Sequence, residues 1–334
     1  MKQTLLKLLN VYGASGREDD VRAVIEQAAR PFCDQMRTDA LGNLICVRRA
    51  SGEAPVRRVM VSAHMDHIGF VVLDADEQGF LRVHNAGGIA KRASINRHVV
   101  FANGVNGVVS NELEDFSSDD GKLSNLFIDI GASDREDALS RVSIGDVAVY
   151  APDAFELANG MLAAPAMDDR VGCAIALKAM EALGPCENEV AFVFTAQEEL
   201  GLRGARAAAY SLDPDIGVAL DVTLSGDTPK GPKIAVRAGK GPCVKVRDSS
   251  LVCAPRVVAG LEKAAQRAGV EVQREVLLAG GNDAGAIQAS RAGVLAGTIS
   301  IACRYVHSAC ETVSLADCEG AARLLAEFLR EPGV

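Results

Sequence analysis

Residues 190–199 read VAFVFTAQEE, an apolar run that ends in two adjacent carboxylates. A short run rich in Val and Phe predicts a buried β-strand over Val190–Thr195. The segment before it, Asp169–Leu183, has helical spacing and stops at Gly184, which is followed by proline. The segment after it, Gln197–Tyr210, is rich in alanine and is expected to be helical. A buried strand between two helices predicts an α/β architecture.

The same alternation extends outward from this stretch in both directions. Further strands are expected at residues 43–47, 58–62, 216–220 and 294–301, and further helices at residues 257–269 and 316–329. A short helix is expected near Leu5, and Ser15 and Glu18 have capping-box spacing ahead of a second one. Aromatic residues make up only 4% of the chain, so the core must be built from aliphatic side chains. These features predict a mostly parallel sheet with helices on both faces.

Between residues 70 and 158 the pattern changes to short β-like runs separated by Gly and Asn turns. The runs are Phe70–Leu73, Phe80–Val83, His98–Phe101, Gly107–Ser110, Leu126–Ile130 and Val147–Tyr150. An acidic stretch, Glu112–Asp120, is expected to be a solvated loop. Because 334 residues are long for a single core, we expect a small β-rich domain at 70–158, inserted into a larger domain formed by 1–69 and 159–334.

Charge and cysteine content restrict the class of protein. The formal net charge of -9 argues against a nucleic-acid partner, since an acidic surface repels phosphates. The nine cysteines show no C-x-x-C pair, which favours buried thiols in a reducing compartment. The N-terminus lacks the pattern of a signal peptide, and no run of 18 apolar residues exists. We therefore expect a soluble, cytoplasmic protein without a membrane partner.

Five potential metal ligands follow predicted strands or begin a predicted helix. They are His64, Asp168, Glu199, Asp221 and His307. Sites of open α/β sheets form at the carboxyl ends of the strands, so these residues can meet there. Two histidines and three carboxylates suit two divalent ions, with one carboxylate bridging. Each residue alone has an ordinary alternative, such as a helix cap for Asp168, but all five at one sheet edge favour a site.

Two further residues have spacing that suits supporting or catalytic roles. Asp66 follows His64 at two residues, and a carboxylate that accepts the second imidazole N–H would fix the ring of a metal-bound histidine. Glu198 precedes Glu199 at the end of the strand, where adjacent side chains diverge. One glutamate can therefore bind a metal while the other faces the attacking water.

Six motifs, in order along nearly the whole chain, resemble those of the glutamyl and deblocking aminopeptidase family. They are AHMDHIG, MDDRVG, TAQEELGLRGA, ALDVTLSGDTP, AGGNDAG and RYVHSACE. This is the tetrahedral-aminopeptidase group of co-catalytic metallopeptidases, some members of which carry the label endoglucanase. The resemblance implies a zinc-peptidase-like fold, and a β-rich insertion used for dimerisation and often for hollow dodecamers. It therefore implies a homo-oligomer built from dimers.

The resemblance also implies a role for each site residue. His64 and Asp221 become ligands of one metal ion, Glu199 and His307 ligands of the other, and Asp168 the bridge between them. Glu198 becomes the general acid and base, and Asp66 the partner of His64. Zn is the expected ion, with Co or Mn as alternatives.

The expected function is that of a metal-dependent aminopeptidase, which hydrolyses the N-terminal peptide bond with a metal-bridging water activated by Glu198. The substrate is then a peptide with a free N-terminus. Two departures bear on specificity, because the family commonly has Glu in place of His67 and Thr in place of Asn282. The main alternative is a dinuclear-metal amidohydrolase or deacetylase for small N-acyl or amide substrates. A glycosidase and a non-catalytic scaffold are further alternatives.

Overall fold

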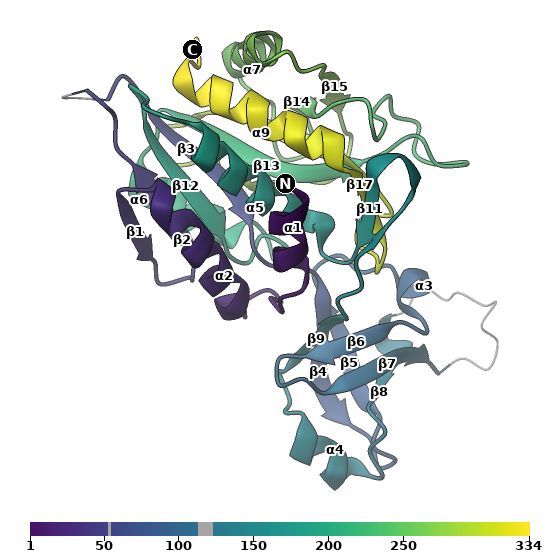
Figure 1. Ribbon diagram of the computed structural model, residues 1–334. Coiled ribbons are helices and arrows are strands. Elements are labelled where there is room, and N and C mark those ends of the chain that lie inside the picture. Colours follow the sequence, from purple (N-terminus) through teal and green to yellow (C-terminus); the bar gives the residue numbers. More distant parts are fainter. Residues whose placement is uncertain (53–54, 113–122) are drawn as a thin grey trace.

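The strand predicted over Val190–Thr195 is β12 (Glu189–Thr195), which lies inside a large mixed sheet (Figure 1). The computed structural model describes residues 1–52, 55–112 and 123–334. In spatial order the strands of this sheet are β1 (Gln35–Thr38), β2 (Leu44–Arg48), β12, β3 (Arg58–His64), β13 (Ile216–Leu224), β16 (Leu295–Arg304), β17 (Glu311–Ser314), β11 (Met161–Ala164) and β10 (Phe155–Glu156). Two more, β14 (Cys243–Arg247) and β15 (Gln273–Val276), branch from β16.

The sheet is parallel at its centre and in the branch formed by β14 and β15. The neighbours β12, β3, β13 and β16 run parallel to one another. Both flanks are antiparallel, at β1–β2–β12 on one side and at β16–β17–β11–β10 on the other. Antiparallel strands can be joined by tight turns, whereas parallel strands need a crossover. The expected mostly parallel sheet therefore holds for the four central strands and fails at the flanks. There, three of the antiparallel pairs join strands that follow one another along the chain, namely β1–β2, β16–β17 and β10–β11.

Alternating side chains let the central strands bury both faces. In β3, Val59 and Val61 belong to the larger core, while Met60 between them belongs to a second core on the other face. The larger core includes α1 (Lys2–Leu9), α2 (Asp19–Ala29), α5 (Met167–Ala182), α7 (Pro255–Ala268) and α9 (Leu315–Arg330). The second core includes α6 (Arg203–Leu212) and α8 (Asp283–Gln288), which gives helices on both faces. No helix in the described part of the chain is long and apolar enough to cross a membrane.

The β-rich segment forms a closed barrel that projects from one end of the sheet (Figure 1). Its strands, in spatial order, are β4 (Gly69–Ala75), β5 (Leu81–Ala86), β8 (Leu126–Asp129), β7 (Asn106–Asn111), β6 (His98–Phe101) and β9 (Val147–Tyr150). Two short helices accompany them, α3 (Lys91–Ser94) and α4 (Arg135–Arg141). The barrel has its own core, in which the rings of Phe70 and Tyr150 pack edge to face with their centroids 5.8 Å apart. Of the predicted acidic loop, all residues after Glu112 lie outside the described residues.

The predicted capping box near the N-terminus is wrong. Helix α2 begins at Asp19, and the Ser15 hydroxyl donates to the Asp66 carboxylate, 2.6 Å away, rather than capping the helix. The Glu18 carboxylate accepts the main-chain N–H groups of Gly16 and Gln197. Both side chains therefore connect the N-terminal segment to the loops at the carboxyl ends of β3 and β12.

Two predicted boundaries beside these loops are also displaced. Strand β13 does not stop before Asp221 but continues to Leu224, because its pairing with β16 extends through Leu224 and Cys303. The helix expected from Gln197 begins only at Arg203. Gln197 has a left-handed φ of 57° that a helix cannot contain, so the residues after β12 form a turn instead. This turn carries the two adjacent glutamates.

A fully buried arginine ties the first helix to these loops. The guanidinium of Arg170 donates to the carbonyl oxygens of Met65, Leu8 and Val11, at 2.8, 2.7 and 3.2 Å. Gly13 leaves space for it, since a Cβ at that position would lie 2.4 Å from an Arg170 nitrogen. Arg170 thus replaces water as the donor for three buried carbonyl groups.

We expect Arg170→Met to lower the free energy of unfolding by about 3 kcal/mol, because three buried acceptors lose a charged donor. Urea denaturation followed by circular dichroism measures the change. The matched control is Arg203→Met, since Arg203 is exposed and its replacement should change stability by about 0.5 kcal/mol or less. Equal effects of the two substitutions would contradict the role given to Arg170.

Candidate metal centre

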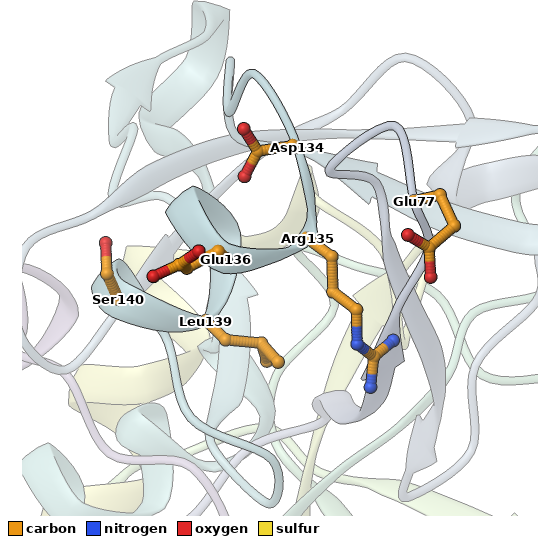
Figure 2. A pocket seen from close by; sticks show the side chains of 6 residues that line it. All are labelled: Glu77, Asp134, Arg135, Glu136, Leu139 and Ser140. Atoms are coloured by element: carbon orange, nitrogen blue, oxygen red, sulfur yellow. The ribbon is translucent and has the colours of Figure 1, made fainter.

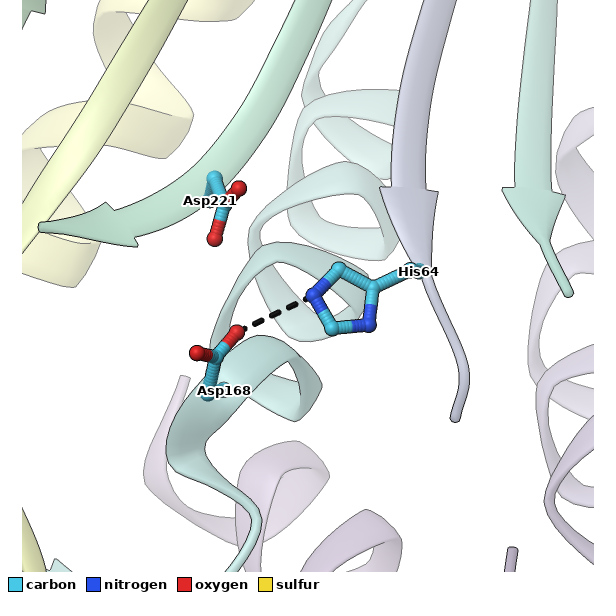
Figure 3. A group of neighbouring side chains, drawn as sticks. All are labelled: His64, Asp168 and Asp221. Carbon is cyan, nitrogen blue, oxygen red and sulfur yellow. Dashed lines mark hydrogen bonds and ion pairs between the residues drawn. The ribbon is translucent and has the colours of Figure 1, made fainter. Parts of the chain in front are cut away.

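Parallel register brings His64 and Asp221 to the same level of the sheet. His64 is the last residue of β3 and pairs with Thr195, the last residue of β12. On the other side of β3, Ala219 of β13 pairs with Ser62, so Asp221 lies level with His64. Asp168 approaches from the start of α5, and the three side chains point toward one another (Figure 3).

Asp168 lies between the two histidines. Its Oδ1 is 3.0 Å from Nε2 of His64, and its Oδ2 is 3.3 Å from Nε2 of His307. The same His307 nitrogen is 3.2 Å from Oε1 of Glu199. The donor atoms form two groups, His64 with Asp168 and Asp221, and Asp168 with Glu199 and His307, each within 4.8 Å. All five predicted residues therefore meet, and Asp168 belongs to both groups.

The loops that carry these residues have unusual backbone conformations. Ala166, Gln197 and His307 adopt left-handed φ angles of 60°, 57° and 61°. Non-glycine residues rarely adopt this region, and such conformations concentrate at functional sites. The turns are thus held by their surroundings rather than by local preference.

Glu311 provides part of that support and was not assigned a role from the sequence. Its buried carboxylate accepts the main-chain N–H of Asp168 at 3.0 Å and that of His307 at 2.6 Å. One side chain therefore fixes the loops of two donor residues. The signal in the sequence was a carboxylate four residues after His307 in an otherwise uncharged stretch.

Asp66 lies beside His64, but its carboxylate hydrogen-bonds main-chain N–H groups rather than the His64 ring. Nδ1 of His64 is 2.9 Å from the Asp66 main-chain oxygen and 3.6 Å from its carboxylate. The carboxylate accepts the main-chain N–H groups of Glu198 and Glu199, at 3.0 and 3.3 Å. Asp66 thus orients His64 chiefly through its backbone and holds the glutamate turn with its side chain.

The neighbouring Asp169 behaves as an ordinary cap. Its carboxylate accepts the N–H of Gly172 at 2.8 Å, as expected at the start of a helix. A Cβ on Gly172 would lie 2.2 Å from that carboxylate, so glycine is required there. The other oxygen of Asp169 accepts the main-chain N–H of His64 at 3.3 Å, so of the two adjacent aspartates only Asp168 contacts the imidazole nitrogens.

Burial and crowding perturb the ionisation of these groups. Burial, with the neighbouring Asp168 carboxylate, raises the pKa of Asp221 well above its usual range, and burial raises the pKa of Glu198 in the same way. Burial alone would lower the pKa of His307, but its hydrogen bonds to Asp168 and Glu199 outweigh burial and raise it to about 12. The cluster therefore holds more negative charge than its buried position can stabilise without added positive charge.

The donor set fits divalent metal ions. Each group offers one imidazole nitrogen and two carboxylates, which are established ligands of Zn²⁺ and similar ions. Bound cations would supply the positive charge that the carboxylates lack. Glu198 is in neither group, yet it lines the same cavity, whose volume is about 520 Å³.

His67 and Asn282, the two residues that differ from the family pattern, lie at different places relative to the cavity. His67 is buried, its Nδ1 has no partner, and it is absent from the cavity wall. Asn282 lines the cavity and caps α8, with its amide donating to Asp248. Asn282 can therefore influence the shape of the site, and His67 can act only through the packing beneath it.

A second hollow, of about 690 Å³, lies on the barrel beside α4 (Figure 2). Its charged side chains are spread around the rim, and Arg135 is already paired with Asp74. In the described part of the chain, both groups of potential metal ligands lie at the sheet edge rather than here. The chemistry therefore belongs to the cavity beside Asp168.

Comparisons with known proteins identify the family. The family model described as M42 glutamyl aminopeptidase matches residues 42–324. A protein of Acetivibrio thermocellus named putative aminopeptidase is 44% identical over 98% of both chains. Among solved structures, aminopeptidase APDkam598 from the archaeon Desulfurococcus kamchatkensis has a TM-score of 0.94 and 35% identity, covering 98% of this chain and 94% of its own.

The TET1 peptidase of Pyrococcus horikoshii, described as assembling into a tetrahedron or a large octahedral shell, has a TM-score of 0.85 and 31% identity over 99% of both chains. The likeness thus includes both the sheet and the barrel. The predicted resemblance is confirmed: the chain belongs to the M42 glutamyl aminopeptidase family and is a hydrolase of the metallo-aminopeptidase class.

Proposed function

We propose that this enzyme removes the first residue of peptides at a centre of two divalent metal ions. His64 and Asp221 would hold one ion, Glu199 and His307 would hold the other, and Asp168 would bridge them. The observation that carries the proposal is the position of Asp168, whose two carboxylate oxygens face two different histidines at 3.0 and 3.3 Å. Zn²⁺ is the proposed ion, because it accepts mixed nitrogen and oxygen ligands.

Cations held in this way would supply Lewis acidity, which lowers the pKa of water and polarises a carbonyl group. The residues of the chain perform the proton transfers. Glu198 accepts the proton of the attacking water and then delivers it to the leaving amine. The hydrogen bonds from its main chain and from Glu199 to Asp66 keep it in position.

The substrate is a peptide whose free α-amino group lies near the donor carboxylates. This requirement separates an aminopeptidase from the related amidohydrolases and deacetylases, for which the same donors would serve. The side chains of Glu198 and Glu199 extend from the same backbone turn. They therefore do not lie on opposite sides of a scissile bond, as the two carboxylates of a glycosidase do. The family match favours the peptide substrate.

The barrel is proposed to be the assembly domain, with 70–158 inserted between the catalytic segments 1–69 and 159–334. Its separate core and closed sheet support independent folding. In the described part of the barrel, large apolar side chains such as Leu73, Val108 and Ile144 are exposed. A homo-oligomer built from dimers, as large as a dodecamer, would cover such residues. Nine free cysteines favour a reducing compartment such as the cytoplasm.

We expect Glu198→Gln to keep both ions and to lose turnover by about 10²-fold or more, because the amide cannot accept the proton. Its neighbour provides the matched comparison. Glu199→Gln should lose activity together with one of the two ions, since Glu199 is a proposed ligand. The measurements are kcat on an aminoacyl-p-nitroanilide and metal content by mass spectrometry. Near-normal turnover of Glu198→Gln with both ions bound would exclude Glu198 as the base.

Asp168→Ala should deplete both ions, because both donor groups contain Asp168. Asp221→Ala is the control, since Asp221 belongs to only one group and its loss should weaken one ion alone. Zinc content after dialysis, measured for both variants and the parent enzyme, gives the stoichiometry. If Asp168→Ala retained one ion at parental affinity, the bridging role would be wrong.

A further inference from the structure

The cavity beside the donor residues has room for more than the reacting groups. Its volume is about 520 Å³, and the five donors occupy only part of its wall. The α-amino group and the scissile carbonyl of a peptide must both lie near the donors. The side chain of the first residue branches from the carbon between these two groups. It is therefore the part of the substrate that fills the adjoining part of the cavity.

Most side chains on that adjoining part are apolar. They come from four separate segments and are Leu202, Val222, Leu224, Leu277, Ala279 and Val306. Thr223 and Asn282 contribute neutral polar side chains. Leu224 is 41% exposed, so an apolar substrate group could cover surface that is now in contact with water. Gly280 and Gly281 complete this part with backbone alone.

The wall also carries one lysine, and its charge is already compensated. Among the described lining residues, Lys245 is the only cationic side chain besides the two histidines. Its ammonium group pairs with Glu275 and lies 3.5 Å from the Asp248 carboxylate. Two carboxylates against one ammonium leave no positive charge for a substrate. A substrate carboxylate would thus leave water without gaining a partner.

The same carboxylates are not available to a basic substrate. Glu275 is fully buried and Asp248 is 2% exposed. Asp248 accepts hydrogen bonds from Ser250 and from the amide of Asn282. Neither carboxylate forms part of the described cavity wall, where the acidic side chains are the donors and Glu198. A lysyl or arginyl side chain would therefore find no carboxylate there other than the proposed metal ligands and Glu198.

We infer that the cavity selects peptides whose first residue is apolar, such as Leu or Met, and disfavours acidic and basic residues. This inference rests on the proposed aminopeptidase function and adds the substrate class to it. It also separates this chain from the glutamyl activity in the description of its family.

The test is kcat/KM for the Zn-loaded enzyme on p-nitroanilides of Leu, Met, Ala, Glu and Lys. The leucyl and methionyl substrates should exceed the alanyl one by about 10- to 100-fold, as expected for methylene groups in an apolar pocket. They should exceed the glutamyl and lysyl substrates by at least a similar factor.

A pair of variants tests whether the residues of the cavity wall select the side chain of the substrate's first residue. Leu277→Arg adds a cation to the wall and should raise the glutamyl-to-leucyl ratio by about tenfold. Leu278→Arg adds the same charge one residue away, where the side chain is 87% exposed and is not part of the wall. The ratio should stay unchanged in this control.

A parent enzyme that is fastest on the glutamyl or lysyl substrate would overturn the inference and leave the aminopeptidase function standing. Equal shifts in Leu277→Arg and Leu278→Arg would also overturn it, because they would show a general charge effect. Inactivity on every free-amine substrate, with both ions bound, would instead overturn the proposed function and with it this inference.

Discussion

A dense group of buried carboxylates at one edge of the sheet governs the rest of this structure. Asp168, Glu198, Glu199 and Asp221 all face one cavity, together with two histidines. Carboxylates removed from water repel one another and are costly unless positive charge accompanies them. Bound divalent ions would offset the free-energy cost of burying these carboxylates. The same ions would make the cluster suited to hydrolysis. The position of Asp168 between the two histidines sets how two such ions would be shared.

Several other features keep these carboxylates in place. Asp66 holds the glutamate turn, Glu311 holds the loops of Asp168 and His307, and the four parallel strands set His64 level with Asp221. Arg170 connects the first helix to the loop after β3. These contacts come from opposite ends of the chain, so the site is a product of the complete fold rather than of any local motif.

Much of this could be predicted from the sequence. Apolar runs followed by His64 or Glu198 place polar groups at strand ends, and the register of parallel strands brings such ends together. The barrel strands were visible as short runs between Gly and Asn turns. Pairing between strands and side chains that are distant in sequence was harder to predict. Nothing in the local pattern shows that β13 continues past Asp221, that the flanking strands are antiparallel, or that Glu275 and Asp248 neutralise Lys245, because these depend on partners distant in sequence.

Asp168 is proposed to bridge two ions, and anomalous X-ray diffraction from zinc-soaked crystals at the zinc absorption edge can locate them. This bridge would give two peaks about 3.5–4 Å apart, one beside His64 and Asp221 and one beside Glu199 and His307, with an Asp168 oxygen next to each. A single peak, or a pair of peaks that Asp168 does not contact, would contradict it.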